Sequence, residues 1–158
     1  MIKVLIVGEG GQGVQVVAEI LAKAAFLEGK KALYIPNFGV EQRGGVSLAF
    51  VTIDDKPIVY PKFGKADILA IFSERSRERV KNYLDEKTKV IEGPAINGQD
   101  KGLPAKTWNI LVLGQINQAS QIVSQKNLIQ ALEERLAEQF KKNPELKELD
   151  LKAINQYS

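Results

Sequence analysis

A glycine-rich turn constrains this chain more than any other feature of its sequence. Gly8, Gly10, Gly11, Gln12 and Gly13 follow an apolar run over 2–7 and come directly before an amphipathic helical pattern, so a strand, a turn and a helix start are predicted in that order. Glycine permits positive φ and close approach of a ligand to the backbone, and the free N–H groups of a helix start carry partial positive charge. The turn is therefore a candidate site for a phosphate or a carboxylate.

The spacing of Gly8, Gly10 and Gly13 also fits the dinucleotide-binding pattern G-x-G-x-x-G. That pattern needs an acid after the second strand to hold the ribose hydroxyls, and the strand predicted over 31–35 ends in Pro36 and Asn37 instead. A nicotinamide or flavin dinucleotide is thus disfavoured. Two interpretations stay open, an anion site and a turn that serves only the packing of strand against helix.

Composition excludes much of the common enzyme repertoire. The 158 residues contain no cysteine and no histidine, which excludes disulfides, thiolate ligation of zinc or iron-sulfur clusters, and Ser-His or Cys-His nucleophiles. We expect no metal site and no catalytic residue in this chain. The net charge of +3 comes from basic and acidic residues mixed along the chain, so nucleic acid is not an expected partner. No apolar run reaches membrane-spanning length and no secretory leader is evident, so we expect a cytoplasmic protein without membrane contact.

Apolar strands alternate with amphipathic helices, which predicts an α/β fold of three layers with a mainly parallel sheet. The first strand, a helix that begins at Val14 and is ended by Gly29, and the strand over 31–35 form a β-α-β unit. A turn at 54–57 predicts an antiparallel hairpin in which 58–60 pairs back on the strand over 46–53. A charged helix is predicted over 73–84, helices over 108–123 and from Ser124 to Phe140, and a surface excursion without assigned function over 92–107. We divide the chain into a domain over 1–142 and a tail or short helix over 143–158.

A second unusual segment lies in the loop after the strand over 31–35. It gathers an aromatic residue, an acid, an arginine and two glycines, namely Phe38, Glu41, Arg43, Gly44 and Gly45. Arg43 can hold a carboxylate or phosphate through paired N–H bonds, and the glycines let a ligand or a neighbouring chain lie against the backbone. The alternative is a solvated loop with a local contact between Glu41 and Arg43.

Together the two segments, G-x-G-G-Q-G and Tyr34-Ile35-Pro36-Asn37-Phe38-Gly39-x-Glu41-x-Arg43-Gly44-Gly45, resemble the gamma subunits of the 2-oxoacid:ferredoxin oxidoreductases, which act on pyruvate, 2-oxoglutarate or ketoisovalerate. Further matches are Pro57-Ile58, Tyr60-Pro61, Asp67, Asn109 and Gly114. The resemblance covers about residues 1–140. Phe38 departs from it, because the family more often has tyrosine there, and the C-terminal helices carry more charge than usual.

The resemblance implies a Rossmann-like subunit of a complex that converts a 2-oxoacid and coenzyme A to acyl-CoA and CO2 while reducing ferredoxin. It implies that thiamine diphosphate, magnesium, iron-sulfur clusters and coenzyme A belong to the complex and that this chain alone binds none of them. The partners would be alpha and beta subunits, with or without a delta subunit, and ferredoxin through the complex. This chain would then be a scaffold and a wall facing coenzyme A, with Gly8, Gly10, Gly11, Gln12, Gly13, Arg43, Gly44 and Gly45 toward the cofactor and Phe38, Glu41 and Asn109 toward substrate or a partner. The alternative is a free-standing protein that binds a nucleotide or phosphate.

Overall fold

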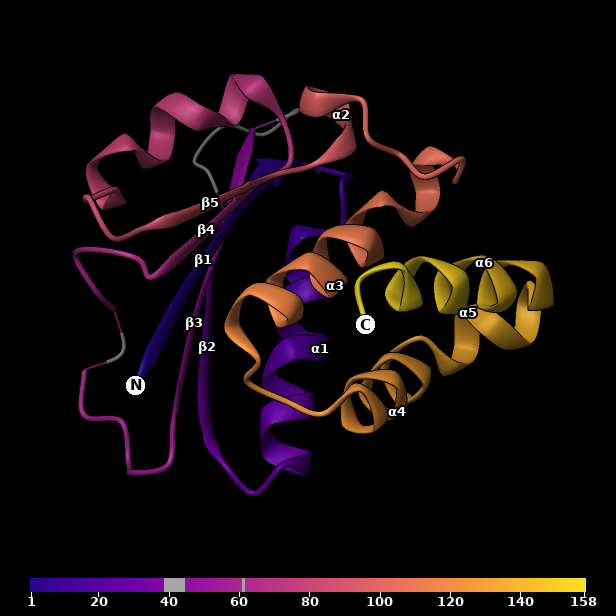
Figure 1. The fold of residues 1–158 in the computed structure, drawn as a ribbon, viewed down its shortest axis with the longest axis horizontal. Coiled ribbons are helices and arrows are strands. Elements are labelled where there is room, and N and C mark those ends of the chain that lie inside the picture. The colour runs from indigo at the N-terminus through magenta and orange to yellow at the C-terminus, as the bar shows by residue number, and fades with distance from the viewer. Residues whose placement is uncertain (39–44, 61) are drawn as a thin grey trace.

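The protein folds into a five-stranded sheet with helices on both faces (Figure 1). Its structure, a computed structural model, describes residues 1–38, 45–60 and 62–158. The strands are β1 (Ile2–Glu9), β2 (Lys31–Phe38), β3 (Val46–Asp54), β4 (Ile68–Ile71) and β5 (Lys89–Glu92). The α-helices are α1 (Val14–Leu27), α2 (Pro94–Asn97), α3 (Trp108–Ser120), α4 (Gln125–Arg135), α5 (Ala137–Lys142) and α6 (Pro144–Ile154). Three 3-10 helices complete the described chain, η1 (Glu74–Tyr83), η2 (Ala105–Thr107) and η3 (Asn155–Tyr157). The prediction of an α/β fold is confirmed.

The sheet is mixed, which corrects the prediction of a mainly parallel one. Its strand order is β2-β3-β1-β4-β5; β1 pairs with β4 and β4 with β5 in parallel, whereas β3 is antiparallel to both β1 and β2. Strand β2 therefore runs in the direction of β1 but is not its neighbour. The reason lies in the short connection from Phe38 to Val46, because neighbouring parallel strands need a crossover of about a dozen residues or more, whereas antiparallel strands can be joined by a short loop.

The hairpin predicted at 54–57 is wrong. Both edges of β3 are already occupied by β1 and β2, so a returning strand has no backbone groups of β3 to pair with. Val59 and Tyr60 accordingly lie outside the sheet, 77% and 80% exposed. The antiparallel hairpin is instead formed by β2 and β3, and the residues that join these strands include the second unusual segment of the sequence.

Side chains alternate between the two faces of the sheet, because successive residues of a strand point to opposite sides. In β1, Val4 and Ile6 pack in the cluster that contains α1, α3 and α4, whereas Leu5 and Val7 pack in a second cluster with Val80 of η1. Figure 1 shows the α-helices α1, α3, α4, α5 and α6 on one side of the sheet and η1 on the other. The first face is thickly covered and the second only in part.

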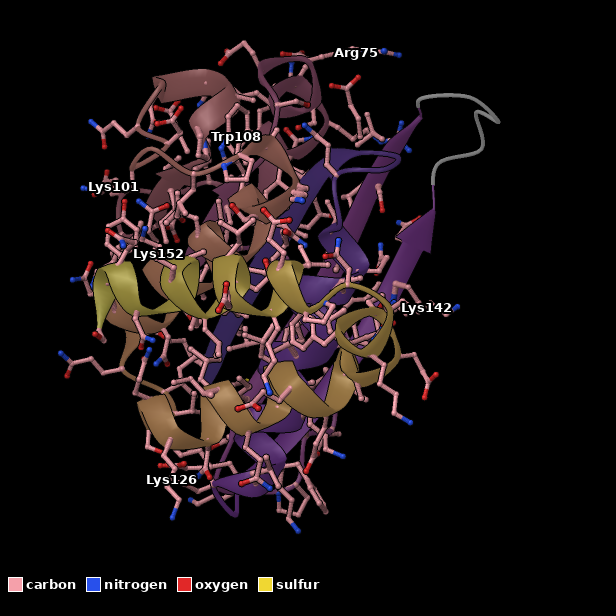
Figure 2. All side chains as sticks on the ribbon, turned by 90° about the vertical axis from the view of Figure 1, so that its right-hand side faces the viewer. Arg75, Lys101, Trp108, Lys126, Lys142 and Lys152 are labelled. Carbon is pink, nitrogen blue, oxygen red and sulfur yellow. The ribbon has the colours of Figure 1, made fainter. Side chains whose placement is uncertain are left out.

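The C-terminal helices are defined by their caps. The Ser124 hydroxyl accepts a hydrogen bond from the Asn127 N–H at 3.2 Å and begins α4, as the sequence predicts. That helix breaks at Leu136 and continues as α5. The tail, which the sequence left as a short helix or a frayed end, forms α6, capped by Asn143 and with Ala153 and Ile154 fully buried. Figure 2 shows α6 lying across the helical face next to α4.

Candidate functional site

The candidate site is a hollow at the carboxyl ends of the parallel strands β1, β4 and β5. Its volume is about 370 Å³. Its lining consists of the glycine turn, the residue after β4, the start of α2 and the segment that leads into α3, namely Gly11, Gln12, Gly13, Phe72, Gly93, Pro94, Ala95, Ala105, Lys106, Trp108, Asn109 and Val112. After β1 the chain passes to one face of the sheet as α1, and after β4 it passes to the other as η1. Such a divergence between adjacent parallel strands opens the crevice in which α/β sheets bind ligands.

Two glycines of the turn have backbone conformations that other residues resist. Gly11 has φ 89° and Gly13 has φ 80°, both in the left-handed region. A Cβ on Gly13 would lie 2.4 Å from the Asn109 Nδ2, so the turn packs directly on the first turn of α3. A Cβ on Gly11 would meet nothing within 4 Å. Gly13 therefore holds the turn against α3, and Gly11 faces open space.

Gly8 and Gly10 have structural roles and do not line the hollow. A Cβ on Gly8 would lie 2.8 Å from the Val14 Cγ2 and 2.9 Å from the Phe72 Cβ, so glycine is needed there for packing. The Gly10 N–H donates to the Gly45 carbonyl at 3.2 Å. For these two residues the structure agrees with the interpretation that the turn serves the packing of strand against helix.

Backbone donors gather on the hollow from two helices. Helix α1 begins after Gly13 and α3 after Thr107, and neither helix start has a side-chain cap among the described residues. Among the described residues, the N–H groups of Gly11 and Gly13 have no hydrogen-bond acceptor, whereas at the start of α3 the Trp108 N–H donates to the Ala105 carbonyl. Unpaired N–H groups and two helix dipoles directed at one hollow favour an anion there.

Hydrogen bonds fix the conformation of the turn. The Gln12 side chain accepts from the Glu9 N–H at 2.7 Å, and the Gln12 N–H donates to the Glu9 carbonyl at 3.1 Å. Gln15, one residue into α1, donates from its side-chain amide to the Ser47 hydroxyl and the Leu48 carbonyl, each at 2.8 Å. The start of α1 is therefore tied to the start of β3.

The second segment of the sequence begins and ends beside this turn. Phe38 pairs with Ser47 in the register of β2 and β3, and Glu9 pairs with Val46, so the turn and the ends of the hairpin share one end of the sheet. Gly45 contacts the turn through Gly10. Glu41, Arg43 and Gly44, and the side chain of Phe38, lie outside the described part of the chain.

Sequence reasoning missed the opposite wall of the hollow. The segment over 92–107, predicted as a surface excursion without function, supplies Gly93, Pro94 and Lys106 to the lining. Lys106 adds a cationic side chain to the lining of the hollow. The sequence did contain a signal for this wall, because Asn109 is one of the residues that match the gamma subunits, and Lys106 lies three residues before it.

A buried carboxyl lies behind this wall. Asp150 of α6 is 2% exposed, and its Oδ1 has no hydrogen-bond partner in the part of the chain that the structure describes. Desolvation raises the pKa of Asp150 to about 7, and the positive charge of Lys106 partly opposes that rise. Asp150 therefore contributes a negative charge behind the Lys106 side of the hollow when it ionises.

The lining contains few polar side chains. Among the described residues that line the hollow there is no carboxylate and no hydroxyl, and the polar side chains are those of Gln12, Lys106, Trp108 and Asn109. The Trp108 Nε1 already donates to the Leu103 carbonyl at 3.0 Å. Residues 1–38, 45–60 and 62–158 contain no cluster of acidic residues that could hold a metal ion. No helix within these ranges has the length and apolarity needed to cross a membrane.

Comparison with known proteins agrees with this architecture. Residues 3–104 match the family Pyruvate ferredoxin/flavodoxin oxidoreductase. The chain is 32% identical to the pyruvate/ketoisovalerate oxidoreductases common subunit gamma of Pyrococcus furiosus over 89% of this chain and 87% of that protein. It is 34% identical to the pyruvate synthase subunit PorC of Methanothermobacter marburgensis over 85% of this chain and 86% of that protein. The chain therefore belongs to the pyruvate ferredoxin/flavodoxin oxidoreductase family.

Solved structures of similar fold are consistent with that membership. The gamma subunit of a keto/oxoacid ferredoxin oxidoreductase from Geobacter sulfurreducens aligns with a TM-score of 0.77 at 25% identity, over 99% of this chain and 96% of that one. A 2-oxoglutarate:ferredoxin oxidoreductase from Magnetococcus marinus, with 2-oxoglutarate, coenzyme A and succinyl-CoA bound, aligns with a TM-score of 0.84 at 17% identity. That match covers 99% of this chain but 30% of the longer protein, and at this identity it shows the fold alone.

Proposed function

We propose that this chain is the gamma subunit of a multisubunit 2-oxoacid:ferredoxin oxidoreductase, and that its hollow forms part of the wall that binds coenzyme A. The proposal rests on one observation, the convergence of unpaired backbone donors of the glycine turn, two helix starts and Lys106 on a hollow without acidic lining among the described residues. Coenzyme A carries phosphates, and such a hollow favours their charge. Family membership and the names of the relatives support the assignment to the complex.

The role of this chain is to bind and orient, because cofactors supply the difficult chemistry in such enzymes. When bound, coenzyme A supplies the thiol that accepts the acyl group. The N–H groups at the start of α1 would hold its phosphates, and Lys106 would add charge from the opposite wall. The iron-sulfur clusters would belong to partner subunits, since this chain has no cysteine for a cluster, and the resemblance implies thiamine diphosphate between the alpha and beta subunits.

The segment over 38–45 would contribute to the same wall. Gly45 lies against Gly10, so the residues before Gly45 join the chain next to the glycine turn. We propose that Arg43 binds a phosphate or carboxylate there, and that Glu41 and Phe38 face substrate or a partner chain. Asn109, which packs on Gly13, would hold the turn in its binding conformation.

The first test is reconstitution. The chain is co-expressed with the alpha and beta subunits of its complex, and 2-oxoacid oxidation is assayed with coenzyme A and ferredoxin. The complex should turn over, and the isolated chain should contain no iron and show no activity. Turnover or stoichiometric iron in the isolated chain would contradict the assignment and favour a protein that works alone.

The second test addresses the hollow. Lys106→Gln should raise the KM for coenzyme A about threefold to tenfold in the assembled enzyme, because a cation beside a phosphate is removed. Lys101→Gln is the matched control, since the Lys101 Nζ lies 5.5 Å from the centre of the Tyr157 ring and does not line the hollow. Equal KM values for both variants and the wild type would leave the hollow without a role in binding coenzyme A.

A further inference from the structure

A second hollow lies at the opposite end of the sheet, at the amino end of β1. Its volume is about 380 Å³, and its lining includes Lys3, Thr52, Val59, Tyr60, Lys62 and Phe63. Phe63 packs edge-on against Phe50 with 5.3 Å between ring centres, so this hollow is on the face of the sheet turned away from α1. Figure 1 shows η1 on this face of the sheet, and its Val80 packs in one cluster with Leu5 of β1 and Leu69 of β4.

A buried hydroxyl in the lining has no partner. Thr52 is 2% exposed, and its Oγ1 makes no hydrogen bond to any residue that the structure describes. Its position in β3, opposite Lys3 in the register with β1, places it among the residues that line the hollow. Leaving a buried hydroxyl unpaired costs free energy, so an incoming polar group that pairs with it would be favoured.

The charge of this hollow is one-sided. Lys3 and Lys62 line it, and no acidic side chain of the described residues does. Two acids nearby already have partners: Asp54 pairs with the Met1 amine at 3.6 Å, and Asp67 accepts from the Lys3 N–H at 2.8 Å. The Lys62 Nζ lies 5.7 Å from the centre of the Phe50 ring, which holds the ammonium over the hollow. An anionic occupant complements this arrangement.

The rim of the hollow is apolar and strongly exposed. Val59 and Tyr60 are 77% and 80% exposed, among the most exposed large apolar side chains in the described chain. Leu33 and Ile35 of the edge strand β2 are half-buried on the same face, since they pair with Thr52 and Phe50 of β3. Apolar side chains around a cationic hollow are the composition of a protein interface rather than of a site for a small anion alone.

We propose that this hollow docks an acidic segment of a partner subunit, whose carboxylate meets Lys3 and Lys62 and whose flanking apolar side chains cover Val59 and Tyr60. The inference rests on the proposed function, because it takes the partner to be another chain of the oxidoreductase complex. It separates two surfaces on one small subunit: the carboxyl end of the sheet faces the cofactor, and the amino end holds the chain in the assembly.

The test measures binding of the full-length chain to the purified alpha and beta subunits. The double variant Lys3→Glu with Lys62→Glu should raise the dissociation constant about tenfold or more and remove most of its dependence on salt. Lys126→Glu is the control with the same kind of charge change; Figure 2 shows Lys126 on the helical face, on the other side of the sheet. An unchanged dissociation constant, or an equal loss in the control, would overturn the docking site.

Thr52→Val supplies a second test, in which weaker subunit binding cannot be attributed to a folding defect. Replacing an unpaired buried hydroxyl by an isosteric methyl should leave the melting temperature of the isolated chain unchanged or higher, yet weaken subunit binding about threefold to tenfold.

Wild-type chain that fails to bind the partner subunits would contradict the proposed function itself. Wild type that binds, with both sets of variants binding equally well, would contradict the docking site alone. Variants that dissociate a homodimer but leave subunit binding unchanged would overturn it in favour of a second copy of this chain.

Discussion

The two ends of the sheet present hollows of similar volume, about 370 and 380 Å³, that are built in different ways. At the carboxyl end the lining includes three glycines, two of them at positive φ, and the starts of two helices, beside side chains such as those of Lys106 and Trp108. At the amino end the walls are side chains, two lysines and several apolar residues around an unpaired hydroxyl. The two hollows therefore differ in the atoms that would recognise a ligand or partner.

This difference determines which substitutions can disturb each end. At the carboxyl end the backbone donors of the turn are insensitive to the loss of a side chain but sensitive to any Cβ that alters the path of the turn, and only the contribution of Lys106 depends on its side chain. A surface of charged and apolar side chains responds to truncation and charge reversal while its backbone stays unchanged. Matched variants at the two ends can thus separate a cofactor-facing surface from an assembly surface.

The largest effect should come from Gly13→Val. A Cβ there would lie 2.4 Å from the Asn109 Nδ2 and 3.0 Å from its Cγ, at φ 80°. Overpacking and backbone strain together should lower the free energy of unfolding by roughly 3 to 5 kcal/mol, measured by urea denaturation. A double variant that also carries Asn109→Ala should recover the part due to the clash. If Gly13→Val were as stable as the wild type, the tight contact between the glycine turn and α3 would be disproved.

The next effect concerns pH and Asp150, which lies behind the Lys106 side of the carboxyl-end hollow. Burial raises the pKa of Asp150 to about 7, whereas an aspartate of the unfolded chain titrates near 3.8. The folded state thus holds its proton more tightly, so the stability that this group contributes is fully present below about pH 4 and is lost as pH rises toward 7. By linkage the wild type should lose up to about 4 kcal/mol from this group between pH 4 and 8.

Asp150→Asn tests that loss, because asparagine keeps the shape and carries no charge. Unfolding measured at pH 5 and pH 8 should show a flatter pH dependence in the variant, with the larger gain in stability over wild type at pH 8. Parallel pH profiles for the two proteins would mean that Asp150 ionises in the folded chain as readily as in the unfolded one.

For Arg43, which the sequence places in a glycine-rich loop, we expect Arg43→Ala to leave the melting temperature of the isolated chain nearly unchanged, since a charge in a solvated loop contributes about 0 to 1 kcal/mol to stability. In the assembled enzyme it should raise either the KM for coenzyme A or the dissociation constant of the subunits about tenfold or more. A change in KM would assign Arg43 to the carboxyl-end surface, and a change in subunit binding would assign it to the interface. If neither quantity moved by more than about threefold, which is under 1 kcal/mol, Arg43 would be an ordinary surface residue.

The sequence predicts the local elements of this fold better than their neighbours in space. The glycine turn, α1 and the Ser124 cap follow from patterns within a few residues, and the structure contains each of them. The position of β3 between β1 and β2 depends on pairings between distant residues, from 37 positions apart for Glu9 with Val46 to 51 for Ile2 with Ile53, which periodicity alone does not specify. The same limit explains the wrong hairpin at 54–57.

The candidate site also consists of one part that local sequence patterns predict and one part that they do not. The glycine turn was predicted as one wall because glycines that need positive φ stand out in a sequence. The opposite wall, with Gly93, Pro94 and Lys106, was not, because an irregular segment acquires a role only from what it packs against. The unpaired Thr52 hydroxyl at the amino end is likewise visible only once the strand partners are known.

The smallest expected effect comes from replacing single glycines by alanine at the two ends of the sheet, and it gives the most direct comparison of these ends. Gly11 and Gly29 have nearly equal φ values of 89° and 84°, and a Cβ on either would meet nothing within 4 Å. Alanine at each should therefore cost the same backbone strain, about 1 kcal/mol in the free energy of unfolding. Gly11 lines the carboxyl-end hollow, whereas Gly29 lies beyond the end of α1, just before β2 begins. In the assembled enzyme Gly11→Ala should raise the KM for coenzyme A about threefold, because a methyl group intrudes where the ligand approaches the backbone, and Gly29→Ala should leave it unchanged. Equal stabilities with different KM values would isolate the binding contribution of the turn from its contribution to folding. Equal KM values would restrict the turn to packing, which is the interpretation that the sequence alone leaves open.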